Sequence, residues 1–418
     1  MLFRASEAER PDLTPLEGAY AHQRWRKILI ILVLLVLVLA AANLSLMMNS
    51  LDLSYFETVE YLVNHLLGKT YDVRLEWLND YFLWNVYLPR TVLGVFLGAG
   101  LAICGVAMQA VMNNPLADAY TTGISDGACF GAVAAIVTGF TFSSVAGSMG
   151  IVVNAFIGGL IPAIILIVLS SVVRMSSATL ILAGTALSYI FSGLETSIMI
   201  VTDAETLKEA YLWQIGTLSD ILSWDQCVIP SVVTIVSMAI LWVCSNKLNL
   251  LALGDDSAKS LGLNVRAFKA IVMIVVSVSV AALVSYVGII GFIGLVAPHL
   301  VRMIMGGDNR YLMPASALVG SLLILVADMI SRTIIAPDEL RVGVIISMIG
   351  APIFLYIILS KKKSYGEVFR CSSTGPGGRT CQSWRSPTAT TTGARSSPRW
   401  SCSRRRWPSH SAPYSYPS

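Results

Sequence analysis

The sequence predicts an all-α polytopic membrane protein with about ten transmembrane helices. Hydrophobic residues make up 55% of its 418 residues and charged residues only 13%, whereas a soluble domain carries roughly 25% charged residues to maintain a polar surface. The mean hydropathy is +0.70, and several apolar stretches reach the ~20 residues that a helix needs to cross a ~30 Å hydrocarbon core. A surface this poor in charge indicates that most of it faces lipid.

Hydropathy and helix-breaking residues place ten spans after a cytoplasmic segment over residues 1–27. The first span could instead be a secretory signal, but it begins far from the N-terminus and lacks a convincing cleavage site, so we interpret it as retained. The eighth span is short and rich in glycine. The ten spans are expected near residues 28–47, 89–112, 119–140, 148–172, 178–201, 227–245, 267–287, 289–305, 311–333 and 341–360.

The placement of Lys and Arg orients these spans. With the N-terminus inside, most basic residues before the C-terminal tail lie on the cytoplasmic side, which is the positive-inside pattern of a cell-membrane protein. An even number of spans then leaves both termini in the cytoplasm. The cytoplasmic basic residues would be Arg24, Arg26, Lys27, Arg174, Lys247, Lys259, Arg266, Lys269, Arg302, Arg310 and Lys361 to Lys363.

Two external segments are longer than simple connections. In the first, residues 49–88, the aromatic and apolar pattern at 55–63 favours an interfacial helix. The second, residues 203–224, carries Trp213 and Trp224, which suit the headgroup level of a bilayer. Anchoring to membrane lipid is the favoured interpretation of these aromatic residues, and a substrate gate is the alternative.

The last 49 residues, 370–418, contain no Leu, Ile, Val, Met, Lys, Asp or Glu. Such a segment is predicted to be disordered, because it cannot bury enough apolar surface to offset its chain entropy. Its eight arginines dominate the net charge, which falls from +4 to about −4 without them. A basic tail could bind anionic lipid or nucleic acid. We favour an unselected extension and expect no nucleic-acid partner.

The second span opens on Pro89 and Arg90, where a proline at a helix start loses no hydrogen bond. Gly94 and Gly98 follow with the GxxxG spacing that lets helices pack closely in lipid. A compact turn then connects to the third span over residues 113–118, and its side chains can cap the flanking helices. The turn residues that we single out are Asn114, Pro115 and Asp118.

Ionisable residues inside the predicted spans are few. Asp126 lies about eight positions into the third span, where a carboxyl group is costly and suggests a functional role; a solvated or structurally paired carboxylate is an equal alternative. His299 lies in a stretch whose glycines, among them Gly291, and Pro298 predict a short or broken helix, which a membrane protein tolerates only where it is buried in protein or lines a cavity. A hydrogen-bonded histidine near the helix end is favoured over a metal ligand or proton relay. The scattered cysteines lack metal-site spacing, so no metal site is expected.

The cytoplasmic loop at 249–263 is too long for a tight turn and too short for a domain. Its acidic residues and serine can cap a short helix ending at Gly262, and Leu253, Ala258 and Leu261 offer a small apolar face. Short helices of this kind could dock a soluble partner, with an ordinary connection as the alternative. The residues expected to form this surface are Leu250, Leu253, Gly254, Asp255, Ser257, Ala258, Leu261 and Gly262.

At four of these stretches the chain resembles the permeases of ABC importers for iron–siderophore complexes, haem and cobalamin. The resemblance covers roughly residues 25–365 and rests on four segments in the family's order and spacing. Together they are specific, although their short parts are not. The segments are LPRTVLGVFLGAGLAICGVAMQAVMNNPLAD, LNLLALGDDSAKSLGL, GIIGFIGLVAPHLVRMIMGGDNR and LRVGVIISMIGAPIFLYIIL.

This resemblance implies a type II ABC importer permease within residues 28–365. It also implies a second permease subunit, as a homodimer or close heterodimer, two cytoplasmic ATPase subunits and an external substrate-binding protein. The loop at 249–263 resembles the family's coupling helices. Arg74 and Arg90 are weakly supported external candidates for contacts with the binding protein. By similarity the fifth span is a candidate pathway wall, with candidate residues Gly184, Ser188, Ser192 and Glu195.

The function implied by the resemblance is transport of an iron chelate or cobalamin, without catalysis by this chain. The sequence contains no GxxxxGK[ST] motif, so ATP is expected to be used by the partner, and no cofactor is expected here. An ion-coupled secondary transporter is the alternative, because Asp126 and Asp328 could serve as membrane-embedded carboxylates. An intramembrane enzyme would need a convergent catalytic cluster, which the sequence does not suggest.

Overall fold

The computed structural model describes residues 14–366 apart from 49–50, 52, 70, 72, 143–146, 173–175 and 336–337. Part of the predicted N-terminal segment, and the whole of the predicted tail at 370–418, lie outside the described residues. The chain divides into two units, Met1–Ile358 and Leu359–Ser418, and the first contains the helical bundle.

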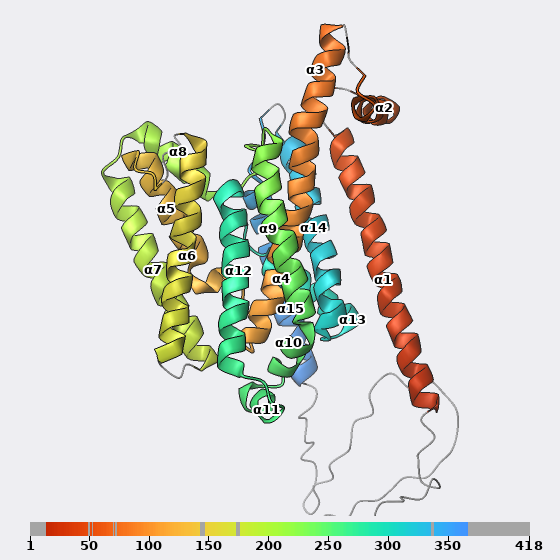
Figure 1. Ribbon diagram of the computed structural model, residues 1–418, viewed down its shortest axis with the longest axis vertical. Coiled ribbons are helices and arrows are strands. Elements are labelled where there is room, and N and C mark those ends of the chain that lie inside the picture. Colours follow the sequence, from red (N-terminus) through yellow and green to blue (C-terminus); the bar gives the residue numbers. More distant parts are fainter. Residues whose placement is uncertain are drawn as a thin grey trace, which may run out of the picture. The chain divides into compact units, whose positions relative to one another are not determined.

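The described chain is helical, and its one β pairing is an isolated bridge between Ile215 and Ile289 (Figure 1). Within the described residues, seven helices can cross a membrane by length and composition, and three shorter apolar helices bring the total to the ten that the sequence predicts. The long helices are α1 (Thr14–Met47), α4 (Leu88–Val111), α6 (Ser148–Val172), α7 (Ser177–Ile200), α9 (Trp224–Val243), α12 (Val265–Val287) and α14 (Asn309–Thr333). The shorter ones are α5 (Ile124–Thr138), α13 (Ile293–Met305) and α15 (Val342–Gly366).

Short helices occupy several of the connections between these spans. Helices α2, α3 and α8 lie at one end of the bundle, and α11 lies at the opposite end (Figure 1). The predicted external and cytoplasmic segments are therefore separated as the charge pattern requires. In the described residues these elements are α2 (Tyr55–Leu66), α3 (Arg74–Phe82), the π-helical η2 (Leu83–Tyr87), the 3-10 helix η3 (Ala119–Thr122), α8 (Ala204–Gln214), α10 (Ser245–Leu251) and α11 (Asp255–Ser260).

Capping residues explain where the two short helices α2 and α8, predicted to be external, begin. Ser54 and Glu57 form a reciprocal capping box at α2, with the Ser54 N–H donating to the Glu57 carboxylate at 2.7 Å. Asp203 accepts from the N–H groups of Glu205 and Thr206 at the start of α8. Because these hydrogen bonds stabilise the charged form, they lower the pKa of both Glu57 and Asp203. A helix at 55–63 is thus confirmed.

The segment before the second span differs from the expected loop. Residues Arg74–Val111 form one continuous helical stretch through α3, η2 and α4. Pro89 lacks an N–H group and cannot continue the regular α-helical ladder, and a π-helical turn directly precedes this part of the helix. In that turn the Leu88 N–H donates to the carbonyl of Leu83. A proline near a span boundary thus marks a change of helix type here, where the sequence suggested a helix start.

Helix α4 forms the centre of the core, with α9, α12, α13 and α14 packed around it. Glycines permit these close approaches. A Cβ atom at Gly98 would clash with the backbone of Gly320 on α14, and one at Gly105 would clash with the backbone of Gly294 on α13. The predicted packing role of the GxxxG segment is confirmed at Gly98, while Gly94 contacts only side chains.

A second group of helices, α5, α6 and α7, packs beside this core through α12. Here Gly127 of α5 and Gly158 of α6 touch backbone to backbone. Helix α1 packs on α14 through Val38 and Ala41 and leaves most of its apolar side chains exposed. Exposed apolar helices of this length fit a lipid environment.

Candidate functional site

The α10–α11 segment forms an exposed surface at the end of the bundle where α11 lies. The side chains of Leu253 and Leu261 are 65% and 59% exposed, whereas Ala258 is fully buried. The predicted apolar face therefore has two leucines, and Ala258 anchors α11 instead. Gly254 and Gly262 bracket this helix with φ angles of +101° and +86°, which glycine adopts without strain.

Asp255 has a different role from the capping predicted for this loop. Gly254 is the N-cap of α11 and provides no side-chain hydrogen bond. The Asp255 carboxylate instead pairs with Lys269 of α12, with an Nζ–Oδ2 distance of 2.8 Å. Its other oxygen accepts from the Asn113 amide at 3.5 Å. Asp255 therefore connects α11 to α12 and to the turn after α4.

The turn at 113–118 has the compact geometry that the sequence suggests. The Asn114 side chain accepts from the Leu116 N–H at 3.0 Å, and the buried Asp118 caps η3 by accepting from the Ala119 N–H at 2.7 Å. Capping is thus confirmed for Asp118. Pro115 lines a cavity of about 260 Å³ between this turn, Ala252 beside α10 and the end of α13.

The broken-helix prediction at 288–302 is confirmed, because Gly288 to Phe292 are non-helical and α13 begins at Ile293. His299 is buried in the middle of α13, so its predicted place near the helix end is wrong. Near the end of the same helix, the Arg302 guanidinium donates to the Gln109 side chain of α4 at 2.8 Å. Both Arg302 and Gln109 line the 260 Å³ cavity. Gly291 lies in the non-helical stretch, with no close neighbour among the described residues that would exclude a side chain.

A groove opens at the other end of the bundle between α5, α7 and α8. One cavity of this groove has a volume of about 470 Å³, and its polar lining residues include Asp126, Ser192, Glu195, Thr196 and Gln214. A neighbouring cavity of about 500 Å³ shares two lining residues with it and extends to the start of α15. We call these two adjoining cavities the external groove, after the side of the membrane that the sequence predicts for α8.

Two of the four predicted pathway residues line this groove, namely Ser192 and Glu195. Ser188 is not among the lining residues of either cavity and lies one helical turn before Ser192 on α7. Gly184 does not line the groove, because it packs against the backbone of Thr121 in η3. Its smallness serves helix packing, which a sequence pattern alone does not separate from a pathway role.

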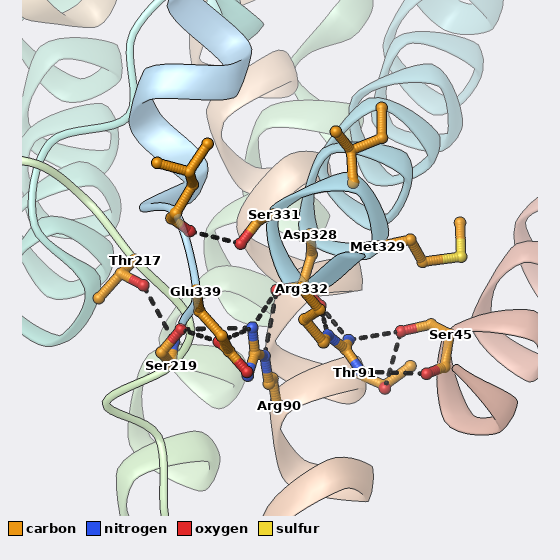
Figure 2. Close-up of polar contacts among 12 residues, drawn as sticks. Ser45, Arg90, Thr91, Thr217, Ser219, Asp328, Met329, Ser331, Arg332 and Glu339 are labelled. Atoms are coloured by element: carbon orange, nitrogen blue, oxygen red, sulfur yellow. Dashed lines mark hydrogen bonds and ion pairs between the residues drawn. The ribbon is translucent and has the colours of Figure 1, made fainter. Parts of the chain in front are cut away.

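A buried ionic network joins the helix ends near α3 (Figure 2). Arg90 donates to Asp328 of α14 at 2.8 Å and to Glu339 at 2.9 Å. Arg332 binds the other oxygen of Asp328 and donates to the Ser45 hydroxyl of α1 at 2.8 Å. Ser219, in the segment after α8, donates to Glu339. These contacts connect α1, α4, α14 and the segments that border α8 and α15.

The network corrects two expectations. Arg90 is 3% exposed and fully engaged, so it is not available as a surface contact, although Arg74 remains exposed on α3. Asp328 is bound by two arginines and is not a free membrane-embedded carboxylate. Burial raises the pKa of Glu339, but the hydrogen bonds from Arg90 and Ser219 outweigh it, so the pKa lies below 4.5.

Known proteins with similar sequences are membrane permeases, in agreement with the helical bundle described above. A model of the FecCD transport family matches residues 28–360. The hemin transport system permease of Yersinia pestis is 35% identical over 284 residues, covering 67% of this chain and 84% of the relative. The vitamin B12 import system permease of Salmonella typhi is 33% identical over 318 residues, covering 75% and 95%.

A solved structure described as an inward-facing conformation of a transporter of the metal-chelate ABC type has the same fold. It aligns with a TM-score of 0.69 at 28% sequence identity and covers 79% of this chain and 99% of the solved chain. The match of the family over nearly all described residues supports the ABC importer over an ion-coupled transporter. The protein belongs to the FecCD transport family, as a permease subunit of an ABC importer.

Proposed function

We propose that this protein forms the membrane pathway of an ATP-driven importer that moves an iron chelate, haem or cobalamin across the cell membrane. Family membership supports the transport role, and relatives named for hemin and vitamin B12 transport support this class of cargo. The observation that carries the proposal is the exposed pair Leu253 and Leu261, which lies on the end of the bundle opposite the external groove.

The proposed assembly contains two ATPase subunits docked on the α10–α11 surface, a second copy of this chain and an external substrate-binding protein. Exposed leucines flanked by charged residues suit a groove on a soluble partner. The sequence has no GxxxxGK[ST] motif, which supports a nucleotide site on the partner and neither a cofactor nor hydrolysis in this chain. Both termini would be cytoplasmic, with lipid covering α1.

The contacts of Asp255 suggest how movement of the docked surface would reach the pathway. Displacement of α11 would act on α12 through the Asp255–Lys269 ion pair and on the 113–118 turn through Asn113. Helix α12 runs from there to Val287, two residues before Ile289 of the external groove. Packed helices move as rigid bodies, so a change at one end is transmitted along their length.

The docking proposal is tested by titrating the purified full chain in nanodiscs with its ATPase. The double variant Leu253→Asp/Leu261→Asp should weaken binding by at least tenfold, because two apolar contacts are replaced by hydrated charges. Ser260→Asp is the matched control, since it adds a charge to the same helix without removing an apolar side chain. Equal affinity of the double variant and the wild type would contradict the proposed docking surface.

A further inference from the structure

The external groove contains a buried carboxyl group that is not matched by a partner. Glu195 is 8% exposed and lines the 470 Å³ cavity, and it makes neither a hydrogen bond nor an ion pair with any described residue. Asp126 lines the same cavity from α5. A carboxyl group on a membrane-spanning helix is costly unless it serves a function, and two that line one cavity point to a role in the pathway.

The described part of the groove has no positive charge to offset these groups. Neither cavity has Lys, Arg or His among its described lining residues. Lys208 of α8 is exposed and is not among the lining residues. Arg341, at the start of α15, donates to the carbonyl of Ile215 at 3.2 Å and lies 3.7 Å from Asp220. The described residues that line the two cavities are therefore acidic or uncharged, and Arg341 lies behind Ile215 with its guanidinium already engaged.

From this arrangement we propose that the external groove selects cargo by charge, and that this permease carries neutral or cationic metal chelates and disfavours anionic ones. The inference rests on the proposed function, because it assumes that cargo passes through the groove. It adds the charge class of the cargo, which the family assignment leaves open.

Electrostatics in a narrow cavity supports this selectivity. Charges interact more strongly beside protein and lipid than in water, because the surrounding dielectric constant is low. A cleft lined by one sign of charge also changes the local concentration of charged ligands by about 10- to 1000-fold. An anionic chelate would lose hydration in the groove and find no cation there. A neutral or cationic chelate has no such penalty.

The electrostatic potential in the groove is measured first, in an experiment that does not depend on transport. Thr196 lines the cavity, so a Thr196→Cys variant with the native cysteines replaced places one thiol in the groove. The rate of its reaction with a cationic methanethiosulfonate reagent is divided by the rate with an anionic one. This ratio is then divided by the same ratio for a free thiol in solution. We expect this ratio to favour the cation by roughly tenfold and to approach one in Asp126→Asn/Glu195→Gln.

Ser197→Cys is the matched control position, because Ser197 is the next residue of α7 and is not among the lining residues. Its ratio should be near one in both backgrounds. A ratio near one at Thr196→Cys, or a ratio that survives removal of both carboxyl groups, would overturn the electrostatic part of the proposal.

Cargo choice is then measured in proteoliposomes containing the complete transporter and its binding protein. The probes are ferric trihydroxamates, one cationic and one neutral, and a trianionic ferric tris-catecholate. For each protein we take the ratio of the uptake of the anionic chelate to that of the cationic chelate. The binding protein is the same in wild type and in Asp126→Asn/Glu195→Gln, so a difference between their ratios reports the contribution of the permease alone. We expect that ratio to rise roughly tenfold, with Glu209→Gln, an exposed residue outside the lining, as the control.

The outcomes separate this inference from the proposed function. If the wild type accumulates chelate only with ATP but the uptake ratio is the same in wild type and the double variant, charge selection is wrong and the importer stands. If the wild type takes up none of the three chelates while the thiol ratio is as expected, the groove's field stands but both the proposed cargo and charge selection fail.

Discussion

Asp328 is fully buried and accepts hydrogen bonds from two arginines, Arg90 and Arg332. A single carboxylate thus pairs with two cations that come from two helices, α4 and α14. Arg90 also donates to the carboxylate of Glu339. Arg332 has Asp328 as its anionic partner and otherwise donates to uncharged oxygens, including the carbonyl and hydroxyl oxygens of Ser45. The free energy of the network therefore depends most on the charge of Asp328.

We expect Asp328→Asn to destabilise the folded protein by about 3 kcal/mol, because the loss of one buried partner leaves buried charge without compensation. The measurement is the unfolding free energy, or the Tm, in a fixed detergent. Asp220→Asn is the control, since Asp220 is exposed and lies 3.7 Å from Arg341, and surface pairs contribute under about 1 kcal/mol. Equal effects of the two substitutions would contradict the structural role of the network.

The lowered pKa of Glu339 predicts a pH dependence of stability. A carboxyl group whose folded-state pKa lies below its unfolded value stabilises the fold fully above the unfolded pKa of about 4.5. That contribution is lost as the pH falls through the folded-state pKa. The Tm difference between wild type and Glu339→Gln should therefore be constant from pH 7 to pH 5.5 and shrink below pH 4.5. A difference that grows on acidification would contradict this assignment.

At the residue scale the sequence identified the important charges but not their partners. Arg90 and Asp328 were each conspicuous, one in a motif and one inside a span, yet 238 positions separate them. Hydropathy and spacing do not report which spans are neighbours, so Arg90 was only a weakly supported surface candidate, and Asp328 was considered for ion coupling only under the alternative of a secondary transporter. Glu195 was singled out only by similarity to the permease family, as part of the fifth span, whereas Asp126 was singled out because an acidic residue inside a span is unusual whatever its neighbours.

The helices depend on glycine where their backbones touch. Gly98 of α4 faces Gly320 of α14 so closely that a methyl group would clash with the backbone. A backbone cannot rotate away as a flexible side chain can, so the two helices would have to separate.

We expect Gly98→Ala to destabilise the protein by roughly 1–3 kcal/mol through overpacking. Gly193→Ala on α7 is the matched control, because no described atom lies within 4 Å of the added Cβ, and alanine favours a helix over glycine by about 1 kcal/mol. The comparison uses Tm values in the same detergent. A neutral Gly98→Ala would show that α4 and α14 are less closely packed than described here.

The Asp255–Lys269 ion pair joins α11 to α12 and is the contact between helices that most directly couples the docking surface to the pathway in our proposal. Asp255→Lys should lower transport several-fold per ATP hydrolysed, because like charges would separate α11 from α12 while the exposed leucines stay in place. The double variant Asp255→Lys/Lys269→Asp should recover part of the loss. Chelate uptake and ATP hydrolysis are measured in the same vesicles. Unchanged uptake per ATP in the single variant would exclude a coupling role for the pair.

Most span positions followed closely from the sequence, since apolar length and helix-breaking residues define a span. The third and first spans are exceptions, because residues 119–140 divide into η3 and α5 and because α1 begins at Thr14 instead of residue 28. Observed α6 and α7 match the predicted bounds to within one residue. Continuity of α3, η2 and α4 was missed, because Pro89 looks like a helix start and a π-helical turn has no clear sequence signal. Ala258 was assigned to the docking face because α11 is only six residues long, too short for its buried side to be read from periodicity.

At the scale of the whole molecule, the two candidate surfaces lie at opposite ends of one helical bundle. The α10–α11 surface is an apolar patch fit for a soluble partner, and the external groove is a polar cavity fit for cargo. Helix α12 runs between them. This separation suits a pathway that is driven from one end of the bundle. A partner docked at that end shifts the equilibrium between two conformations of the permease only if it binds one of them more tightly than the other.

The most direct test of this account is accumulation of a labelled ferric trihydroxamate in proteoliposomes that contain the complete transporter. The account predicts accumulation that requires ATP hydrolysis and is abolished by Leu253→Asp/Leu261→Asp but retained in Ser260→Asp. An ion gradient alone should drive no uptake. Uptake that continues without ATP, or that the double leucine variant leaves unchanged, would contradict the claim that a docked ATPase drives this permease.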